Sequence, residues 1–350
     1  MERVDEGLAF MLKYENVAWY EKGRVKILDR RIYPIEVSYV TCTSHKEVAK
    51  AIADMVTQSA GPYTAAGMGM ALAAYECREL IESEQIKYLE NAAYTLANAR
   101  PTTANRMTLI VNGCLEVSKT ARNNGQDIAE AIFQHTFNSI NHRYSRIGIV
   151  AKYLVDMFPN NGNVMTQCFG ETIVGMMLKE VKKRNNNIKL FCPETRPYLQ
   201  GARLTASVAF DQGFEVTVIT DNMPAATMKN KNIDVFTSAA DSICLDGHIV
   251  NKVGTMQIAI SAKYFQVPYF VTGIPDKGYD TISKVKIEER DPNQVLEFRG
   301  VKNTMAGVKG YYPSFDITPP ALVAGVVTDK GIFSPYDLKR YFEAEVEKFY

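Results

Sequence analysis

The feature that most constrains the fold of this chain is a regular alternation of short apolar runs and amphipathic stretches between residues 163 and 272. Apolar runs such as NVMTQC and IKLFCP are each followed by a longer segment with helical spacing. Repeated strand–helix units of this length are typical of a doubly wound, Rossmann-like parallel sheet. We therefore predict an α/β domain over residues 151–350.

Residues 1–150 have a different pattern and predict a smaller, mostly helical N-terminal domain. Apolar and polar residues alternate on both sides of Gly23, which favours a hairpin leading into a third strand of a short antiparallel sheet. From Ser44 to about Val155 the apolar residues follow a period of 3.6, as in packed helices. We place the domain boundary near residues 145–160.

Composition argues for a small-molecule partner. Lys plus Arg is 40 and Asp plus Glu is 39, so no overall charge attracts nucleic acid or an anionic membrane. The six cysteines are widely spaced and include no CxxC pair, which favours reduced thiols and no metal site. The opening MERVDEGL lacks a basic region followed by an apolar core, so we expect a cytoplasmic protein.

Three residues with useful chemistry follow predicted strands. In a parallel α/β sheet the ligand crevice lies at the carboxyl ends of the strands, and Cys168, Arg196 and Asp241 all occupy that position. Cys168 precedes a predicted helix whose positive end favours the thiolate, whereas Asp241 follows two alanines whose apolar surroundings raise a carboxyl pKa. The alternatives are that Cys168 is a small buried hydrophobe and that Asp241 caps a turn.

Several polar residues are candidates for holding an anion. Gln200 opens a predicted helix with free N–H groups, Asn251 and Lys252 precede another helix start, and Arg100 and Arg196 offer planar guanidinium groups. The loop QSAGP at 58–62 also precedes a helix. The alternatives are solvated surface charges and ordinary helix punctuation.

Other polar residues favour structural roles. Asp221 is expected to hold the crevice loops through hydrogen bonds, and Asp246-Gly247 to form a hairpin turn. Asp316 and Thr318 precede a helix predicted to begin near Pro320. Two roles are open for them, support of a neighbouring segment or capping of this helix, and we favour the cap. The chain has neither a dinucleotide-binding glycine motif after a strand nor a phosphate-binding P-loop.

Taken together, these motifs resemble the methylthioribose-1-phosphate isomerases. That family belongs to a superfamily with the ribose-1,5-bisphosphate isomerases and the regulatory subunits of translation initiation factor 2B. The resemblance covers most of the chain in matching order and spacing. It is carried by AIADMV, RPTTAN, TQCFGET, RPYLQGARLTA, VITDNMPA, SAADSICLDGHIVNKVGT, IEERDP and FDITPP.

The resemblance implies an aldose–ketose isomerase whose substrate carries its phosphate on the anomeric oxygen. It implies acid/base catalysis by Cys168 and Asp241, without a metal or an organic cofactor. It also implies a homodimer formed through the parallel-sheet domain. The residues that it assigns to the substrate's phosphate and hydroxyls are Arg100, Gln200, Asn251 and Lys252, and the loop residues Gln58, Ser59 and Ala60.

Two departures from the family pattern bear on the substrate. The family's Arg-Gly-Ala-Pro loop is replaced by QSAGP, which loses a guanidinium contact worth roughly 1.5–3 kcal/mol. The cysteine motif, QCFGE, also differs from the family's small polar run. We therefore expect a divergent branch that acts on 5-deoxyribose 1-phosphate or methylthioribose 1-phosphate, in the salvage of 5-deoxynucleoside by-products. The alternatives are a ribose-1,5-bisphosphate isomerase and a non-catalytic regulatory subunit.

Overall fold

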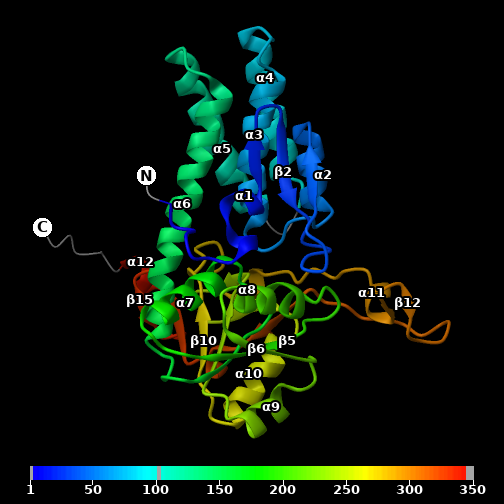
Figure 1. Cartoon of the computed structure of the whole chain (residues 1–350), viewed down its shortest axis with the longest axis vertical. Coiled ribbons are helices and arrows are strands. Elements are labelled where there is room, and N and C mark those ends of the chain that lie inside the picture. The colour runs from blue at the N-terminus through cyan, green and yellow to red at the C-terminus, as the bar shows by residue number, and fades with distance from the viewer. Residues whose placement is uncertain (1–2, 101–103, 344–350) are drawn as a thin grey trace, which may run out of the picture. The chain divides into compact units, whose positions relative to one another are not determined.

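The structure is a computed structural model that describes residues 3–100 and 104–343 (Figure 1). Contacts between residues group the chain into two compact units, Met1–Ser145 and Arg146–Tyr350. No helix among these described residues is long and apolar enough to cross a membrane.

A three-stranded antiparallel sheet lies near the start of the first unit, as the alternating pattern predicts. Gly23, with φ near +82°, makes the tight turn between the first two strands, where Glu21 pairs with Arg24. The strands, in spatial order, are β1 (Trp19–Glu21), β2 (Arg24–Leu28) and β3 (Tyr39–Cys42).

Helices make up the rest of the first unit. They are α1 (Tyr14–Val17), α2 (His45–Ala53), α3 (Gly61–Glu76), α4 (Glu82–Ala97), α5 (Ala104–Asn123) and α6 (Ile128–Val155), which continues into the second unit. Helix α3 is buried on nearly every side because its small residues let neighbours approach closely. A Cβ added at Gly69 would lie 3.0 Å from side-chain atoms of Val48 and Leu96.

A seven-stranded sheet forms the centre of the second unit. Its spatial order is β15-β14-β10-β7-β4-β5-β6, and every neighbouring pair is parallel except β14 with β15. The strands are β4 (Asn163–Met165), β5 (Lys189–Pro193), β6 (Glu215–Ile219), β7 (Val235–Ala239), β10 (Tyr269–Thr272), β14 (Gly325–Thr328) and β15 (Gly331–Phe333). This confirms the predicted α/β fold.

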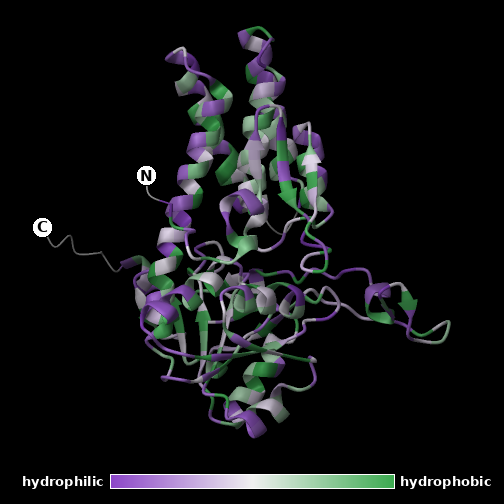
Figure 2. Cartoon of the chain, in the orientation of Figure 1, coloured by the Kyte–Doolittle hydropathy of each residue, from purple (hydrophilic) through white to green (hydrophobic). Residues whose placement is uncertain are grey.

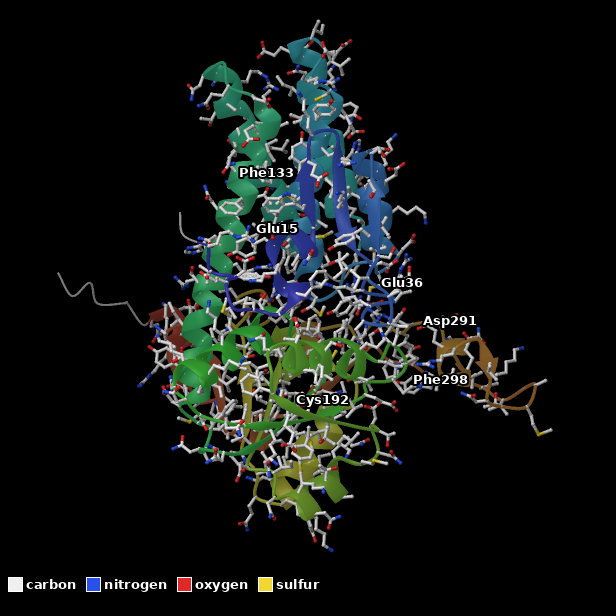
Figure 3. All side chains as sticks on the ribbon, in the orientation of Figure 1. Glu15, Glu36, Phe133, Cys192, Asp291 and Phe298 are labelled. Atoms are coloured by element: carbon white, nitrogen blue, oxygen red, sulfur yellow. The ribbon has the colours of Figure 1, made fainter. Side chains whose placement is uncertain are left out.

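The helices that alternate with these strands are α7 (Thr172–Lys183), α8 (Ala206–Asp211), α9 (Pro224–Lys231) and α10 (Thr255–Tyr264). A five-residue π-helical turn, Gly201–Thr205, leads directly into α8. Figure 2 shows hydrophobic residues along the central strands. The rings of Phe236 on β7 and Tyr269 on β10 stack there with centroids 4.2 Å apart. Cys192 on β5 is likewise buried within the sheet (Figure 3).

The order of the strands defines a reversal point in the sheet. From β4 the chain builds β5 and β6 toward one edge, then returns to place β7 on the other side of β4. The later strands β10, β14 and β15 extend the sheet toward the opposite edge. Such a reversal opens a ligand crevice outside the carboxyl ends of the two strands that flank it, here β4 and β7.

Two smaller groups of strands complete the second unit. An antiparallel sheet joins β8 (Ser242–Ile243), β9 (Ile249–Lys252) and β13 (Phe315–Thr318). A separate arm carries α11 (Asn293–Leu296), β11 (Glu297–Phe298) and β12 (Val301–Lys302), and extends away from the sheet of this unit (Figure 1). Figure 3 places Phe298 on this arm.

The prediction of a helix that begins near Pro320 is wrong. Phe315–Thr318 form strand β13, Pro320–Leu322 make one 3₁₀ turn, and the chain then enters β14. The prolines themselves do not exclude a helix, because the first turn of a helix needs no N–H donors. The valine-rich segment that follows pairs instead with β10. The last short helix is α12 (Arg340–Glu343).

Candidate active site

Cys168 lies in a tight loop beyond the carboxyl end of β4. Its backbone adopts φ near +58°, and Glu171, which precedes α7, also has a positive φ. The Thr205 hydroxyl donates a hydrogen bond to the Cys168 carbonyl. The loop therefore holds this half-buried residue in a defined place at the reversal point.

The predicted thiolate at Cys168 is not supported. Burial raises the pKa of the thiol to about 11, the positive charge of Lys252 lowers it, and the negative charge of Asp241 raises it. Helix α7 begins only at Thr172, and a helix end acts mainly within its own first turn. The thiol is therefore protonated at neutral pH and suited to donate a proton.

Asp241 lies two residues beyond β7, on the other side of the reversal point. Its backbone N–H donates to the Val250 carbonyl at 2.9 Å, which fixes the loop against β9. The side chain is exposed, so the expectation of a carboxylate buried among apolar groups is wrong. Asp241 and Cys168 thus flank the crevice that the strand order predicts.

Asn251 and Lys252 are buried at the end of β9, just before α10. The Asn251 amide donates to the Thr255 hydroxyl at 3.0 Å. The Lys252 ammonium donates to the Ser314 carbonyl at 2.9 Å and lies 4.7 Å from the ring centroid of Phe315. A cation held in this way lies close enough to Cys168 to favour its ionised form.

Gln200 is buried before the π-helical turn, and its side-chain oxygen has no hydrogen-bond partner among the described residues. The free N–H groups expected just after it are in fact used. The Ala202 N–H donates to the Glu194 carbonyl, and the Arg203 N–H donates to the Leu199 carbonyl. The group without a partner at this position is therefore the side-chain oxygen of Gln200, not the backbone N–H groups that follow it.

Arg196 does not offer its guanidinium to a phosphate in this structure. It donates to the carbonyls of Gln294 and Glu297 and lies over the Phe298 ring, so it fastens the base of the arm. The predicted structural role of Asp221 is confirmed, because its carboxylate accepts hydrogen bonds from the N–H groups of Thr195 and Arg196, each at 2.7 Å.

Asp316 caps α10, not a helix at Pro320. Its carboxylate accepts hydrogen bonds from the N–H groups of Gly254 at 2.7 Å and Met256 at 3.1 Å. Burial raises its pKa to about 6, against the effect of these two bonds.

The predicted turn at Asp246-Gly247 is confirmed, since it joins the paired strands β8 and β9 with Gly247 at φ near +87°.

In the first unit, the loop Gln58–Ala60 precedes α3, as predicted. Arginine side chains fix its backbone: Arg30 donates to the Gln58 carbonyl at 2.9 Å, and Arg143 of α6 donates to the Ala60 carbonyl at 3.1 Å. Ser59, at φ near +58°, is exposed. Sequence analysis missed both arginines because neither lies near the loop in the chain.

A cavity of about 300 Å³ lies between α3, α5 and α6 within the first unit, lined in part by Thr64, Ile110, Ser139 and Arg143.

Arg100 lies between α4 and α5, and residues 101–103 of its RPTTAN motif fall outside the described residues. Among the residues that are described, no group of three or more His, Cys, Asp or Glu side chains is placed to hold a metal.

Comparison with known proteins identifies the family. A model described as the Initiation factor 2 subunit family matches residues 59–335. The chain belongs to this family. The curated methylthioribose-1-phosphate isomerase of Thermosipho africanus is 32% identical to the chain over 331 residues, which cover 91% of this chain and 95% of that protein.

Solved structures of family members share the fold over nearly the whole chain. The 5-methylthioribose 1-phosphate isomerase of Pyrococcus horikoshii OT3 has a TM-score of 0.83 and 28% identity, covering 96% of this chain and 99% of its own. The delta subunit of translation initiation factor eIF-2B from A. fulgidus has a TM-score of 0.78 and 26% identity, covering 91% and 96%. The resemblance found in the sequence motifs is therefore confirmed.

Proposed function

We propose that this chain is an aldose–ketose isomerase that converts a 5-substituted 5-deoxyribose 1-phosphate to the corresponding ribulose 1-phosphate. The observation that carries the proposal is the position of Cys168 and Asp241, a thiol and a carboxylate that follow the two strands flanking the reversal point. The relatives named methylthioribose-1-phosphate isomerase support the reaction type.

The reaction needs groups that give and take protons. Because the anomeric oxygen carries the phosphate, the ring opens only when its C1–O4 bond breaks and O4 gains a proton. A hydrogen must then move from C2 to C1 while the C2 hydroxyl loses its proton and becomes the ketone. A protonated thiol at Cys168 and a carboxylate at Asp241 form a suitable acid/base pair.

Substrate binding is assigned to the polar residues around this pair. The side-chain oxygen of Gln200 has no partner within the described part of the chain, and Lys252 supplies a positive charge that acts on Cys168. Asn251 is assigned to the same ligand. In the first unit, the proposal assigns Arg100 and the loop residues Gln58, Ser59 and Ala60 to the phosphate and hydroxyls.

The 5-substituent is proposed to be a hydrogen or a methylthio group, so that the substrate is 5-deoxyribose 1-phosphate or methylthioribose 1-phosphate. The loop QSAGP lacks the arginine that the family has there, which supports a different way of holding the phosphate or a different substrate. The corresponding setting is the cytoplasmic salvage of 5-deoxynucleoside by-products by a homodimeric enzyme.

An NMR assay tests the proposal. Purified protein is given 5-deoxyribose 1-phosphate, methylthioribose 1-phosphate or ribose 1,5-bisphosphate, and phosphorus and proton spectra follow each compound. Conversion of one of the first two to its ketose 1-phosphate is the expected result, with the Cys168→Ser, Asp241→Asn double variant as the inactive control.

Two other results of this assay would each replace the proposal. Conversion of ribose 1,5-bisphosphate alone would assign the bisphosphate reaction. Tight calorimetric binding without any turnover would favour a regulatory role, in line with the similarity to the eIF-2B delta subunit.

A further inference from the structure

The cavity between α3, α5 and α6 is not used by the proposed reaction. It has a volume of about 300 Å³ and lies within the first unit, where the three helices can be followed in Figure 1. None of the residues assigned to the substrate is among its described lining residues. One water occupies about 30 Å³ of the liquid, so the cavity admits a ligand of about ten non-hydrogen atoms.

Close contacts between helices frame this cavity. A Cβ added at Gly67 of α3 would lie 2.6 Å from Thr136 of α6, and one added at Gly113 of α5 would lie 3.1 Å from His135 of α6. Thr136 and His135 both line the cavity. The two glycines therefore let α3 and α5 approach α6 beside the cavity, so that the packing of the helices sets its shape before a ligand binds.

Apolar side chains form part of the wall. Leu109 and Ile110 of α5 and Ile140 of α6 line the cavity, and Leu109 is 72% exposed. A ligand that covers this surface gains from the removal of apolar area from water. A pentose would instead place hydroxyl groups against it. The wall therefore suits an apolar body better than the sugar of the proposed substrate.

Two arginines line the same cavity without a carboxylate partner. Arg143 of α6 donates to the Ala60 carbonyl at 3.1 Å and to the Thr64 hydroxyl at 3.4 Å, and both acceptors are uncharged. Arg106 of α5 has neither a hydrogen bond nor an ion pair with any described residue. No Asp or Glu is among the described residues that line the cavity. Its positive charge is therefore not neutralised within the described part of the chain.

The ends of two long helices add to this positive charge. Tyr63 and Thr64 lie in the first turn of α3, which has 16 residues, and Arg106 lies in the first turn of α5, which has 20. The N-terminal turn of a helix carries a partial positive charge. Because all three residues line the cavity, both helix ends favour an anion there.

A row of polar side chains on α6 completes the cavity wall. His135, Ser139 and Arg143 are spaced four residues apart, so they lie along one face of the helix. The side chains of His135 and Ser139 have no hydrogen-bond partner among the described residues. A serine hydroxyl and a neutral imidazole can each donate one hydrogen bond to an anion.

We propose that this cavity binds a small amphipathic anion, in which a carboxylate or phosphate group is attached to an apolar body. The anionic oxygens bind the guanidinium groups of Arg106 and Arg143, and the apolar body lies against Leu109, Ile110 and Ile140. The inference goes beyond the proposed isomerase function and does not depend on it, because the substrate is assigned to other residues.

Calorimetric titration with phenyl phosphate and phenylacetate tests the inference on the whole chain. Each probe joins an anionic group to a phenyl ring, and at least one of them should bind at one site per chain. Inorganic phosphate lacks the apolar body and benzyl alcohol lacks the charge, so each should bind roughly 10-fold or more weakly than the better probe. Equal binding of either comparison compound, or no binding of both probes, would overturn the inference.

Arg106→Met locates the anionic group, with Lys119→Met as the matched control. Arg106 is exposed and has no partner to lose on substitution, so this variant should fold. Lys119 is an exposed cation on the same helix and pairs with Glu116 away from the cavity. Arg106→Met should weaken binding of the probe roughly 10-fold to 100-fold, the effect of one charge-assisted hydrogen bond, and Lys119→Met should not. Equal binding to the two variants would reject the site.

Ser139→Leu tests the volume of the cavity. The larger side chain occupies the space of the ligand and should abolish binding of the probe, while circular dichroism checks that the variant folds. Amide hydrogen exchange provides a second location that needs no substitution. The bound probe should slow exchange in peptides covering residues 61–67 and 106–113, and protection confined to other segments would overturn the inference.

Failure of this site is distinguishable from failure of the proposed reaction. None of these measurements uses turnover, so they remain valid if the protein converts none of the three sugar phosphates. An excess of 5-deoxyribose 1-phosphate should leave binding of the probe unchanged. Displacement of the probe by the sugar phosphate would place both ligands in one site and would reject a separate cavity for the amphipathic anion.

Discussion

Cys168 and Asp241 follow adjacent parallel strands, β4 and β7, from which the sheet extends in opposite directions. Their loops are tied down separately, the first by the Thr205 hydroxyl and the second by the Val250 carbonyl. The charge of Asp241 raises the pKa of the Cys168 thiol, so the two groups act on each other across the crevice. A proton donor and a proton acceptor are thereby brought to one place by the topology of the sheet.

Removing either member of this pair should abolish most turnover without unfolding the protein. We expect Cys168→Ser and Asp241→Asn each to lower kcat by about 10²-fold to 10⁴-fold, the usual contribution of a positioned acid or base. Asp280→Asn, at an exposed carboxylate paired with Lys284, is the control. Steady-state kinetics and circular dichroism measure both effects, and full activity in either variant would defeat the proposed mechanism.

The raised pKa of Cys168 predicts how its reactivity depends on pH. Only the thiolate reacts with iodoacetamide, and below a pKa of about 11 the thiolate fraction grows tenfold with each pH unit. Alkylation of Cys168, followed by peptide mass spectrometry, should therefore accelerate steadily from pH 7 to pH 10. A rate that levels off below pH 8 would indicate a thiolate at neutral pH and contradict this electrostatic picture.

The raised pKa of Asp316 predicts that the stability of the protein depends on pH. Its pKa is about 6 in the folded protein, above the ordinary value of 3.8, so the folded state binds this proton more tightly. The stabilisation from protonation is fully present below about pH 4 and is lost as the pH rises to about 6. Asp316→Asn removes this titration, so urea unfolding between pH 4 and pH 6 should show a smaller fall in stability than in the unaltered protein.

A second substitution at Asp316 isolates its capping role. Asp316→Ala removes the acceptor for the N–H groups of Gly254 and Met256 and should lower the free energy of unfolding by about 0.5–2 kcal/mol. Asp316→Asn keeps an acceptor oxygen and should lose less. Equal stability of the alanine variant and the unaltered protein at pH 7 would mean that the cap is not needed.

Arg196 is predicted to control the mobility of the arm. Arg196→Met removes two hydrogen bonds to the carbonyls of Gln294 and Glu297, each worth roughly 1.5–3 kcal/mol when the donor is charged. Amide hydrogen exchange in peptides covering residues 293–303 should become at least tenfold faster. Arg299→Met is the control, because Arg299 lies over the same Phe298 ring from an exposed position. Similar exchange in both variants would show that Arg196 does not hold the arm.

Local patterns in the sequence were sufficient to predict most of the fold. The alternation of strands and helices from residue 163 onward, the hairpin at Gly23 and the starts of α3 and α10 depend on spacing and turn chemistry within a few residues. The same patterns placed Cys168 and Asp241 at strand ends. The sequence by itself therefore determined which residues reach the edge of the sheet.

Tertiary structure decided what those residues do there. Strand β9 pairs with β13 across more than sixty residues of chain, and this pairing brings Asp316 to α10 and the Ser314 carbonyl to Lys252. The tertiary structure also buries the Cys168 thiol, and this burial raises the pKa of the thiol to about 11. Burial, charge environment and distant hydrogen bonds depend on which segments meet in space, and no local pattern in the sequence encodes that meeting.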